Sequence, residues 1–179
     1  MKKTAVLLYP QFSEYELSVA LSVLMQGKKP VVTCWTRNEA VRGESGLTCL
    51  PDRMIQEIDL DEIDSVLLPG CMDIMLLKDE EEIFHFLEAA ADKVSVIAAI
   101  SSSPYLLARA GLLKGKRYTV GLAEEARESS GIFEKENYSD ELVVQDGKVL
   151  TARGRGFIEF GTHLGNVLGL SFNGGWYRC

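Results

Sequence analysis

The three serines at positions 101–103 are the residues of this sequence best placed to do chemistry. They join an apolar stretch, residues 94–100, to a helix that we expect to begin at Pro104. A tight turn from a strand into a helix is the shape of a nucleophile elbow, whose apex residue projects its side chain into a site. Ser101 occupies that apex. The same run also suits a plain helix N-cap, because Ser is favoured at a cap before Pro.

A second strand end is expected beside Ser101. The short apolar run at residues 65–68 is closed by Pro-Gly, which makes Gly70 and Cys71 the first residues beyond a buried strand. In an open parallel sheet, ligands bind at the carboxyl ends of the strands. The backbone N–H groups of Cys71 and Ser102 could therefore point at a bound oxyanion, with Gly70 beside them.

A third strand end leads into a helix that carries a carboxylate. Residues 5–9 form a continuous apolar run, which is typical of a strand buried on both faces. Ser13 and Glu16 follow at the spacing of a capping box, in which the Glu side chain bonds back to the N-cap amide. A capping box is one interpretation of Glu16. The family resemblance described below provides another.

The elements that position these residues alternate between strands and helices. This alternation indicates βαβ units, and it predicts an α/β three-layer sandwich with a mostly parallel sheet and helices on both faces. We expect a single domain over residues 1–179, with residues 171–179 as a tail to which no structure is assigned. The predicted strands are residues 5–9, 31–36, 65–68 and 94–100, and residues 115–120 are predicted to form a turn and a strand. The predicted helices begin near Ser13, Asp79, Pro104 and Gly156. Residues 41–50 are expected to form a small hairpin or excursion, and a hairpin is predicted around Asp146-Gly147.

The composition is that of an ordinary globular domain. With 46% hydrophobic and 25% charged residues, the chain is neither disordered nor a coiled coil. A formal net charge of −7 repels phosphate backbones, so nucleic acid is not an expected partner. No apolar run approaches the roughly 18 residues of a membrane helix, and the first apolar run is too short for a signal sequence. We therefore expect a cytoplasmic protein that does not bind membranes.

The cysteines are not spaced as metal ligands. None of them forms a C-x-x-C pair, and only two histidines are present to complete a site. We expect no metal, no other cofactor and reduced thiols. The four cysteines are Cys34 and Cys49, which fall in predicted strands, Cys71, and Cys179 at the end of the sequence.

Four stretches of the sequence resemble motifs of the ThiJ/PfpI superfamily. Residues 66–70 resemble the family's strand followed by Pro-Gly-Gly, and residues 97–104 resemble its elbow motif, AAICxGP. Residues 110–116 resemble the run after the elbow helix, and residues 146–156 resemble the DGxxxTSRGPG motif. The resemblance extends over residues 3–170 and implies a flavodoxin-like, glutamine-amidotransferase-like sandwich. Because the family commonly dimerises, it also implies a homodimer.

The resemblance gives Glu16 a second role. This residue falls where the family has a carboxylate that hydrogen-bonds the elbow residue. By this analogy the Glu16 carboxyl accepts a hydrogen bond from the Ser101 hydroxyl, as a neutral pair or as a weak Ser–Glu dyad. The capping box remains the competing interpretation.

The departures from the family concern its chemistry. The family's elbow residue is a reactive Cys, whereas this chain has Ser101, and Ser102 stands where some members carry His. Other members have a His after the next strand, but residues 119–121 contain none. Cys71 replaces the second Gly of Pro-Gly-Gly, and Ser103 replaces the Gly before Pro. A serine hydroxyl depends on an adjacent base more than a thiol does, so these changes predict weakened chemistry.

Three functions follow from a retained elbow with altered residues. The one we favour is a divergent, stress-related member that binds a small molecule or a partner at Ser101 with weak or no catalysis, because it needs no base. The second is a hydrolase, peptidase- or amidase-like, or a glyoxalase-like enzyme, that uses Ser101 with Glu16. The third is a redox or stress-response protein that works through Cys71, although a small buried side chain in a Gly position is the simpler interpretation of that cysteine.

Four other residues are weaker candidates. His85 lies on an acidic helix, where we expect it to face solvent or a subunit contact, and His163 is expected to be structural in the last helix. Arg153 and Arg155 open that helix and could hold an anion. Surface arginines in a turn are the interpretation we prefer.

Overall fold

A seven-stranded sheet forms the centre of the molecule. The computed structural model describes residues 1–178, so Cys179 lies outside the described residues. The strand order is β5-β2-β1-β6-β7-β9-β8, and every neighbouring pair is parallel except the β8–β9 hairpin. The strands are β1 (Lys3–Leu7), β2 (Val31–Trp35), β5 (Arg53–Met54), β6 (Ile63–Leu68), β7 (Val96–Ile100), β8 (Val143–Asp146) and β9 (Val149–Ala152), with β3 (Val41–Arg42) and β4 (Thr48–Cys49) forming a separate hairpin.

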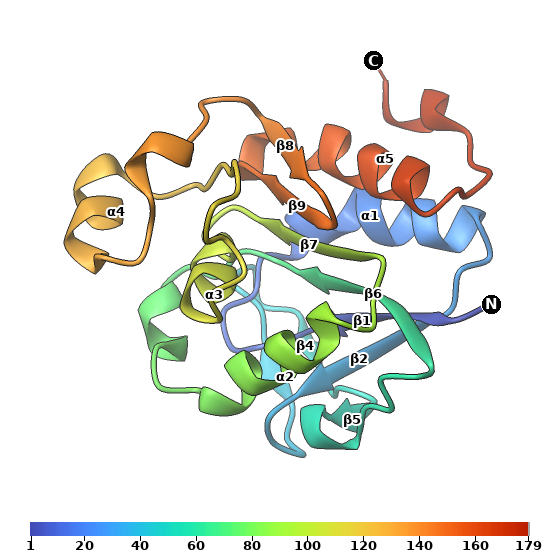
Figure 1. Ribbon diagram of the computed structural model, residues 1–179. Coiled ribbons are helices and arrows are strands. Elements are labelled where there is room, and N and C mark those ends of the chain that lie inside the picture. Colours follow the sequence, from blue (N-terminus) through green and yellow to red (C-terminus); the bar gives the residue numbers. More distant parts are fainter. Residues whose placement is uncertain (179) are drawn as a thin grey trace.

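Helices cover both faces of this sheet. Helices α1 (Glu14–Gln26) and α5 (Phe157–Val167) lie together on one face, and α2 (Glu81–Ala91) and α3 (Pro104–Arg109) lie on the other (Figure 1). The predicted α/β three-layer sandwich is confirmed. None of the helices in residues 1–178 is long and apolar enough to cross a bilayer.

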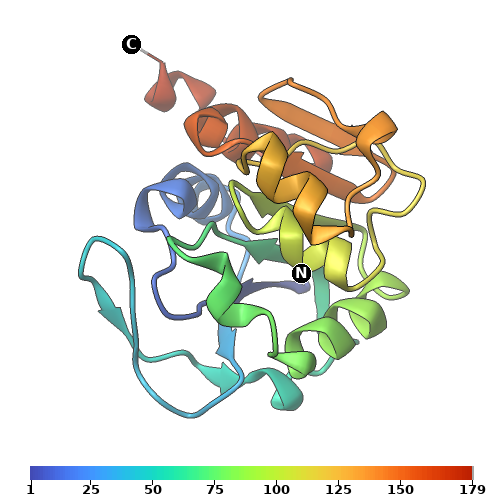
Figure 2. The same cartoon turned by 90° about the vertical axis from the view of Figure 1, so that its left-hand side faces the viewer.

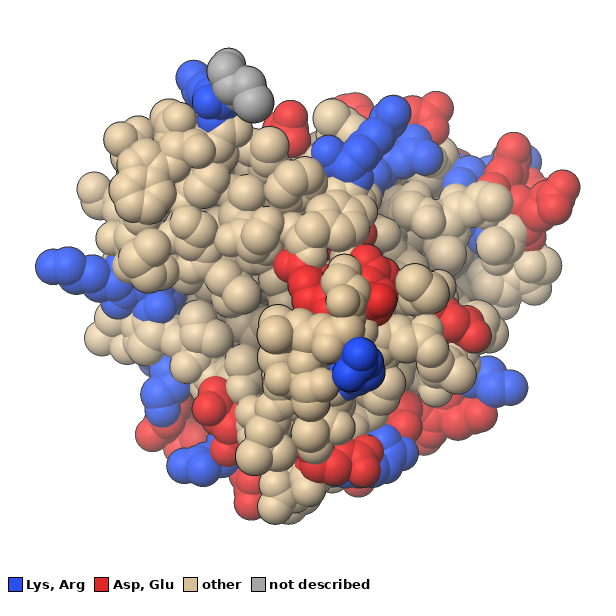
Figure 3. Space-filling view, turned by 180° about the vertical axis from the view of Figure 1, so that it is seen from behind, with Lys and Arg blue, Asp and Glu red and all other residues tan. Residues whose placement is uncertain are grey.

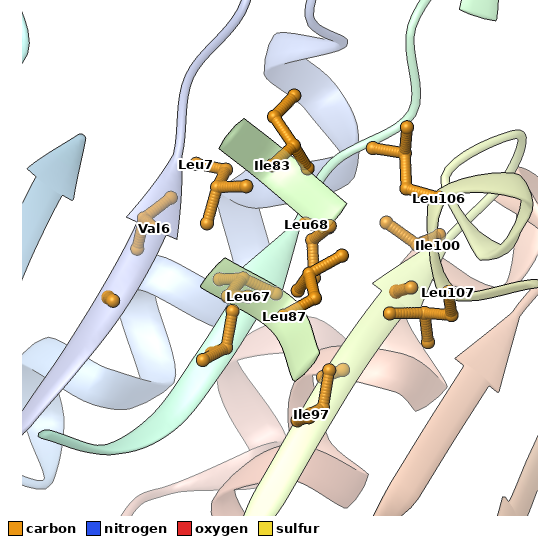
Figure 4. Packing of buried hydrophobic residues seen from close by; sticks show 14 of the residues in the cluster. Val6, Leu7, Leu67, Leu68, Ile83, Leu87, Ile97, Ile100, Leu106 and Leu107 are labelled. Carbon is orange, nitrogen blue, oxygen red and sulfur yellow. The ribbon is translucent and has the colours of Figure 1, made fainter. Parts of the chain in front are cut away.

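The core lies where the central strands meet the helices. All five residues of β7 are fully buried, as are Val66, Leu67 and Leu68 of β6. Ile83 and Leu87 stand one helical turn apart on α2, and both point into this layer (Figure 4). Strands that are buried on both faces explain why the sequence shows continuous apolar runs rather than alternation.

Helices α1 and α5 pack closely because small residues line their contact. A Cβ on Gly161 of α5 would lie 2.6 Å from the backbone nitrogen of Ala20 in α1. Only glycine permits this distance, since real Cβ atoms do not approach backbone atoms so closely. The contact fixes α1, and with it Glu16, against the rest of the sandwich.

One local prediction is wrong, and one helix was missed. Residues 115–120 do not form a strand, because Tyr118 makes only an isolated bridge to Tyr138 and the Thr119 amide donates to the Thr151 side chain instead of a strand ladder. Helix α4 (Glu124–Ser130) was not predicted, because none of its residues is buried and it has no apolar periodicity. The predicted hairpin at Asp146-Gly147 is confirmed, with Gly147 at φ +60°.

The C-terminal segment packs on α1. Asn173 caps a 3-10 turn at Gly174–Tyr177, and the Tyr177 hydroxyl donates to Ser22 Oγ at 2.7 Å and accepts from Gln26 at 2.6 Å. The predicted tail is therefore an ordered turn over residues 174–177.

Candidate functional site

Ser101 stands on a strained turn at the end of β7. Its φ is +65°, a left-handed conformation that a residue with a Cβ adopts only when its surroundings hold it there. The backbone supplies that support: the Ser101 amide donates to the Ala152 carbonyl at 2.8 Å, and the Gly121 amide donates to the Ser101 carbonyl at 2.6 Å. This is the geometry of the elbow that the sequence predicts.

The helix-cap interpretation of the serine run is right for the position of the cap and wrong for its hydrogen bond. Ser103 is the N-cap of α3, but its hydroxyl makes no cap hydrogen bond. It bonds instead to the carbonyls of Leu68 at 2.9 Å and Ile100 at 2.8 Å. Ser103 thus ties the elbow to the end of β6, which brings two of the predicted strand ends together.

Glu16 reaches this elbow from the first turn of α1. The residue is only 2% exposed, its Oε2 accepts from the Gly70 amide at 2.7 Å, and its Oε1 accepts from the Tyr15 hydroxyl at 3.2 Å. Ser13 makes no cap bond and donates to Glu44 instead, so the capping-box interpretation is wrong.

Burial raises the pKa of the Glu16 carboxyl, and the Ser101 side chain, the Gly70 amide and the Tyr15 hydroxyl partly oppose that rise. The family-based expectation that Glu16 meets Ser101 agrees with this placement. The backbone of two glycines approaches the pair closely. A Cβ on Gly70 would lie 2.8 Å from Ser101 Cβ, and one on Gly154 would lie 2.5 Å from Glu16 Oε1.

Ser102 and Cys71 hold each other across the two strand ends. The Cys71 amide donates to Ser102 Oγ at 3.0 Å, and the Ser102 hydroxyl donates to the Cys71 carbonyl at 3.0 Å. Of the amides that could face an oxyanion, those of Gly70 and Cys71 donate within the protein, whereas the Ser102 amide donates to no other group in residues 1–178. An oxyanion at the Gly70 and Cys71 amides would have to displace a carboxylate or a hydroxyl, and only the Ser102 amide would receive it freely.

The Cys71 thiol lies in a buried position behind this contact. The residue is 6% exposed, and its Sγ lies 3.4 Å from the carbonyl oxygens of Pro10 and Asp73. Burial raises the pKa of the thiol to about 11. A thiol with this pKa is almost wholly protonated at neutral pH, and the thiolate is the reactive form.

An open cleft of about 410 Å³ lies above the elbow. Figure 2 looks onto the carboxyl ends of the strands, where the β3–β4 hairpin (cyan), the turn after β6 (green) and α4 surround this edge of the sheet. Four lining residues on loops and turns, Glu44, Met72, Asp73 and Met75, could not be predicted from the sequence, because no motif marks them. The lining comprises Tyr15, Glu16, Glu44, Cys71, Met72, Asp73, Ile74, Met75, Ser101, Ser102, Gly121 and Leu122.

The remaining sequence candidates lie outside this cleft. His85 is exposed on α2, and His163 bonds Gln145 at 2.7 Å. Arg153 faces Asp140 at 3.7 Å, Arg155 is exposed, and Cys34 is buried in β2. Within residues 1–178, no three His, Cys, Asp or Glu side chains are grouped so as to hold a metal ion.

Comparison with known proteins relates this architecture to one family. Residues 2–165 match the DJ-1/PfpI family. The chain is 31% identical over 160 residues to protein dj-1beta of Drosophila melanogaster, covering 87% of this chain and 82% of that protein. It is 24% identical over 153 residues to a deglycase of Thermococcus kodakarensis, covering 84% of this chain and 89% of that protein.

A solved structure from Anabaena variabilis has the same fold. It is a two-domain protein with DJ-1/ThiJ/PfpI-like and ferritin-like domains. The TM-score is 0.84 at 28% identity, over 95% of this chain and 49% of that chain. The present chain therefore spans about half the length of that protein.

Proposed function

This chain belongs to the DJ-1/PfpI family, and we propose that it is a divergent member that binds a small ligand or a partner at the Ser101 cleft, with weak or no catalysis. The relatives include a deglycase, but the residues at the elbow of this chain are not those of a reactive thiolate site. The retained elbow supports binding at the same place.

The proposal rests on the protonation and the hydrogen bonding of the groups around Ser101. An alcohol becomes a nucleophile only when a base accepts its proton. Glu16 is the carboxyl beside Ser101, and burial raises its pKa, which favours the protonated form. Of the amides that could stabilise a developing oxyanion, those of Gly70 and Cys71 already have partners, which leaves the Ser102 amide alone. The cleft is therefore shaped for a ligand but poorly equipped for turnover.

A turnover panel tests this proposal. Wild type, Ser101→Ala and Ser101→Cys would each be assayed with methylglyoxal, an activated ester and a peptide amide. We expect the wild type to match Ser101→Ala on all three. Activity in Ser101→Cys alone would support a scaffold that lacks only its nucleophile. Wild-type turnover that disappears in Ser101→Ala would overturn the proposal.

A hydrolase or glyoxalase-like activity of Ser101 with Glu16 is the second candidate. One observation favours it: the strained φ of +65° at Ser101 is retained, and strain of this kind clusters at active sites. If Glu16 served as the base, the rate would rise with pH through its raised pKa, since only the ionised carboxylate accepts a proton. A flat pH profile at the level of Ser101→Ala would exclude this role.

A redox role of Cys71 is the third candidate and has less support. Its thiol is buried with a pKa of about 11, which is the environment of a structural cysteine. Trapping of sulfenic acid in the wild type after mild peroxide treatment, and its loss in Cys71→Ser, would favour a redox role.

The proposal also covers the biological role, the location and the oligomeric state of the protein, and the role and the oligomeric state are inferred from the family. A stress-related role and a homodimer belong to the proposal on that basis, and a cytoplasmic location belongs to it on the basis of the sequence. The dimer also has a candidate surface in this chain, because α1 carries no charged residue after Glu16.

A further inference from the structure

The Ser101 cleft offers few free hydrogen-bond donors. The Gly70 amide donates to Glu16, and the Cys71 amide donates to Ser102 Oγ. The Ser102 hydroxyl donates to the Cys71 carbonyl at 3.0 Å, and the Tyr15 hydroxyl donates to Glu16 at 3.2 Å. Recognition of a carboxylate or phosphate requires donors that point at the ligand. The Ser102 amide donates to no other group in residues 1–178. An anion in this cleft would therefore meet few free donors and no cationic side chain.

The same cleft has carboxylates that lack a cationic partner. Glu44 is half-buried and accepts from the Ser13 hydroxyl at 2.7 Å, and Asp73 is exposed and accepts from the Met75 amide at 3.1 Å. Neither of them forms an ion pair within residues 1–178, and the lining includes no Lys, Arg or His. A cleft lined by charges of one sign concentrates ligands of the opposite sign.

The lining also has apolar and aromatic surface. Met72 and Met75 are exposed on the turn after β6, and Leu122 is half-buried beyond Gly121. Tyr15 is half-exposed and packs edge-on against Phe157, with ring centroids 5.4 Å apart. Aromatic rings attract cations, and flexible Met side chains adapt to varied apolar groups.

We propose that the Ser101 cleft binds a small organic cation, a protonated primary amine with an apolar body, in preference to a carboxylate or phosphate. The inference rests on the proposed binding function and names its ligand class. An ammonium group carries a positive charge, three donors and no acceptor, so one of the unpaired carboxylates of Glu44 and Asp73 suffices to bind it. A metal ion fits less well, because within the described chain no three ligating side chains are grouped around one point.

Three probes of the same shape test the charge of the ligand. Benzylamine, benzyl alcohol and benzoate would be titrated into the full chain at low salt, with binding located by NMR shifts of amides that line the cleft, such as those of Met72 and Gly121. We expect benzylamine to bind at least about tenfold more tightly than the other two. We also expect its affinity to fall with added salt, because screening weakens exposed charge pairs.

Variants that remove one negative charge test whether Glu44 and Asp73 bind the cation. Glu44→Gln and Asp73→Asn should each weaken benzylamine binding roughly two- to fivefold, the range of a partly exposed ion pair. The matched control is Glu88→Gln, which removes the same charge from an exposed position on α2, outside the cleft, and should leave the affinity unchanged.

The outcomes separate this inference from the proposed function. Equal or tighter binding of benzoate or benzyl alcohol in the cleft would overturn the cation preference and leave the binding function standing. Shifts that do not map to the cleft for any probe would overturn both. Turnover that depends on Ser101, combined with a preference for amine substrates, would overturn weak catalysis and support the cation preference.

Discussion

Glu16 is the buried titratable residue beside the elbow. Its pKa is raised above the ordinary value of 4.5, so the folded protein holds this proton more tightly than the unfolded chain does. The stabilisation from this group is therefore fully present below the ordinary pKa, and it is lost as pH rises through the raised value. The neutral carboxyl is the form that the fold favours.

The substitution Glu16→Gln tests whether the stability contributed by Glu16 falls as pH rises. Glutamine is neutral at every pH and can still accept from the Gly70 amide. We expect the variant to melt at a higher temperature than wild type at about pH 8 and at a similar temperature near about pH 4. Thermal unfolding followed by circular dichroism across this range would measure the difference. If the difference in melting temperature between the variant and wild type did not change with pH, the raised pKa of Glu16 would be contradicted.

The Ser102 hydroxyl provides the hydrogen bonds of the Cys71 amide and the Cys71 carbonyl. Removing this hydroxyl leaves the buried amide and carbonyl of Cys71 without these bonds. We expect Ser102→Ala to lower the free energy of unfolding by about 1–3 kcal/mol, measured by urea denaturation. The control is Ser18→Ala, whose exposed hydroxyl bonds only within its own helix and should change stability by less than about 0.5 kcal/mol. Equal losses in both variants would argue against a specific role of Ser102.

At the scale of elements, the contact between α1 and α5 holds Glu16 against the elbow. A methyl group on Gly161 would lie 2.6 Å from the Ala20 backbone nitrogen, so the helices would have to move apart. We expect Gly161→Ala to destabilise the protein by about 1–3 kcal/mol, although alanine is the better helix former.

The matched control for this variant is Gly174→Ala, where a new Cβ would meet only Phe172 at 3.8 Å. It should be nearly neutral in the same urea experiment. If Gly161→Ala were as stable as Gly174→Ala, close packing would not be what positions α1.

Elements that are built from buried apolar runs could be predicted from the sequence, and those that depend on distant partners could not. The strands β1, β6 and β7 are recognisable in the sequence as continuous apolar runs, because both faces of each strand are covered. Tyr118 and Thr119 lie in an equally strand-like run, but their amides bond to Asn137 and to the Thr151 side chain. Helix α4 shows no amphipathic pattern because none of its residues is buried.

The residues of the candidate site likewise differ in whether the sequence alone could predict them. The elbow at Ser101 has a local signature, a strand that runs through small residues into Pro104, and was predicted from it. The approach of Glu16 was implied only by the family resemblance, because the two residues are 85 positions apart in the chain. Glu44 and Asp73 were missed, since loops bring them to the cleft without any motif.

At the scale of the whole molecule, charge limits where two copies can meet. Each copy carries a formal net charge of −7, so contact between charged faces is opposed by repulsion. Helix α1 has no charged residue after Glu16, and Leu21 and Met25 are 36% and 60% exposed one turn apart. Trp176, in the segment that packs on α1, is 64% exposed. Figure 3 shows a broad area with few charged side chains over this part of the molecule, at the upper left of the view.

This uncharged face is where we expect the proposed homodimer to form. In a two-fold dimer each substitution occurs twice, so Leu21→Glu with Met25→Glu would place four carboxylates in one interface, where unpaired charges are strongly unfavourable. Light scattering after size-exclusion chromatography should give a dimer for wild type and a monomer for this double variant. Leu50→Glu is the control, because Leu50 is 67% exposed directly after β4 and is not part of α1, and its variant should stay dimeric. A dimer that survives the double substitution would move the interface elsewhere, and a monomeric wild type would remove the homodimer from the proposal.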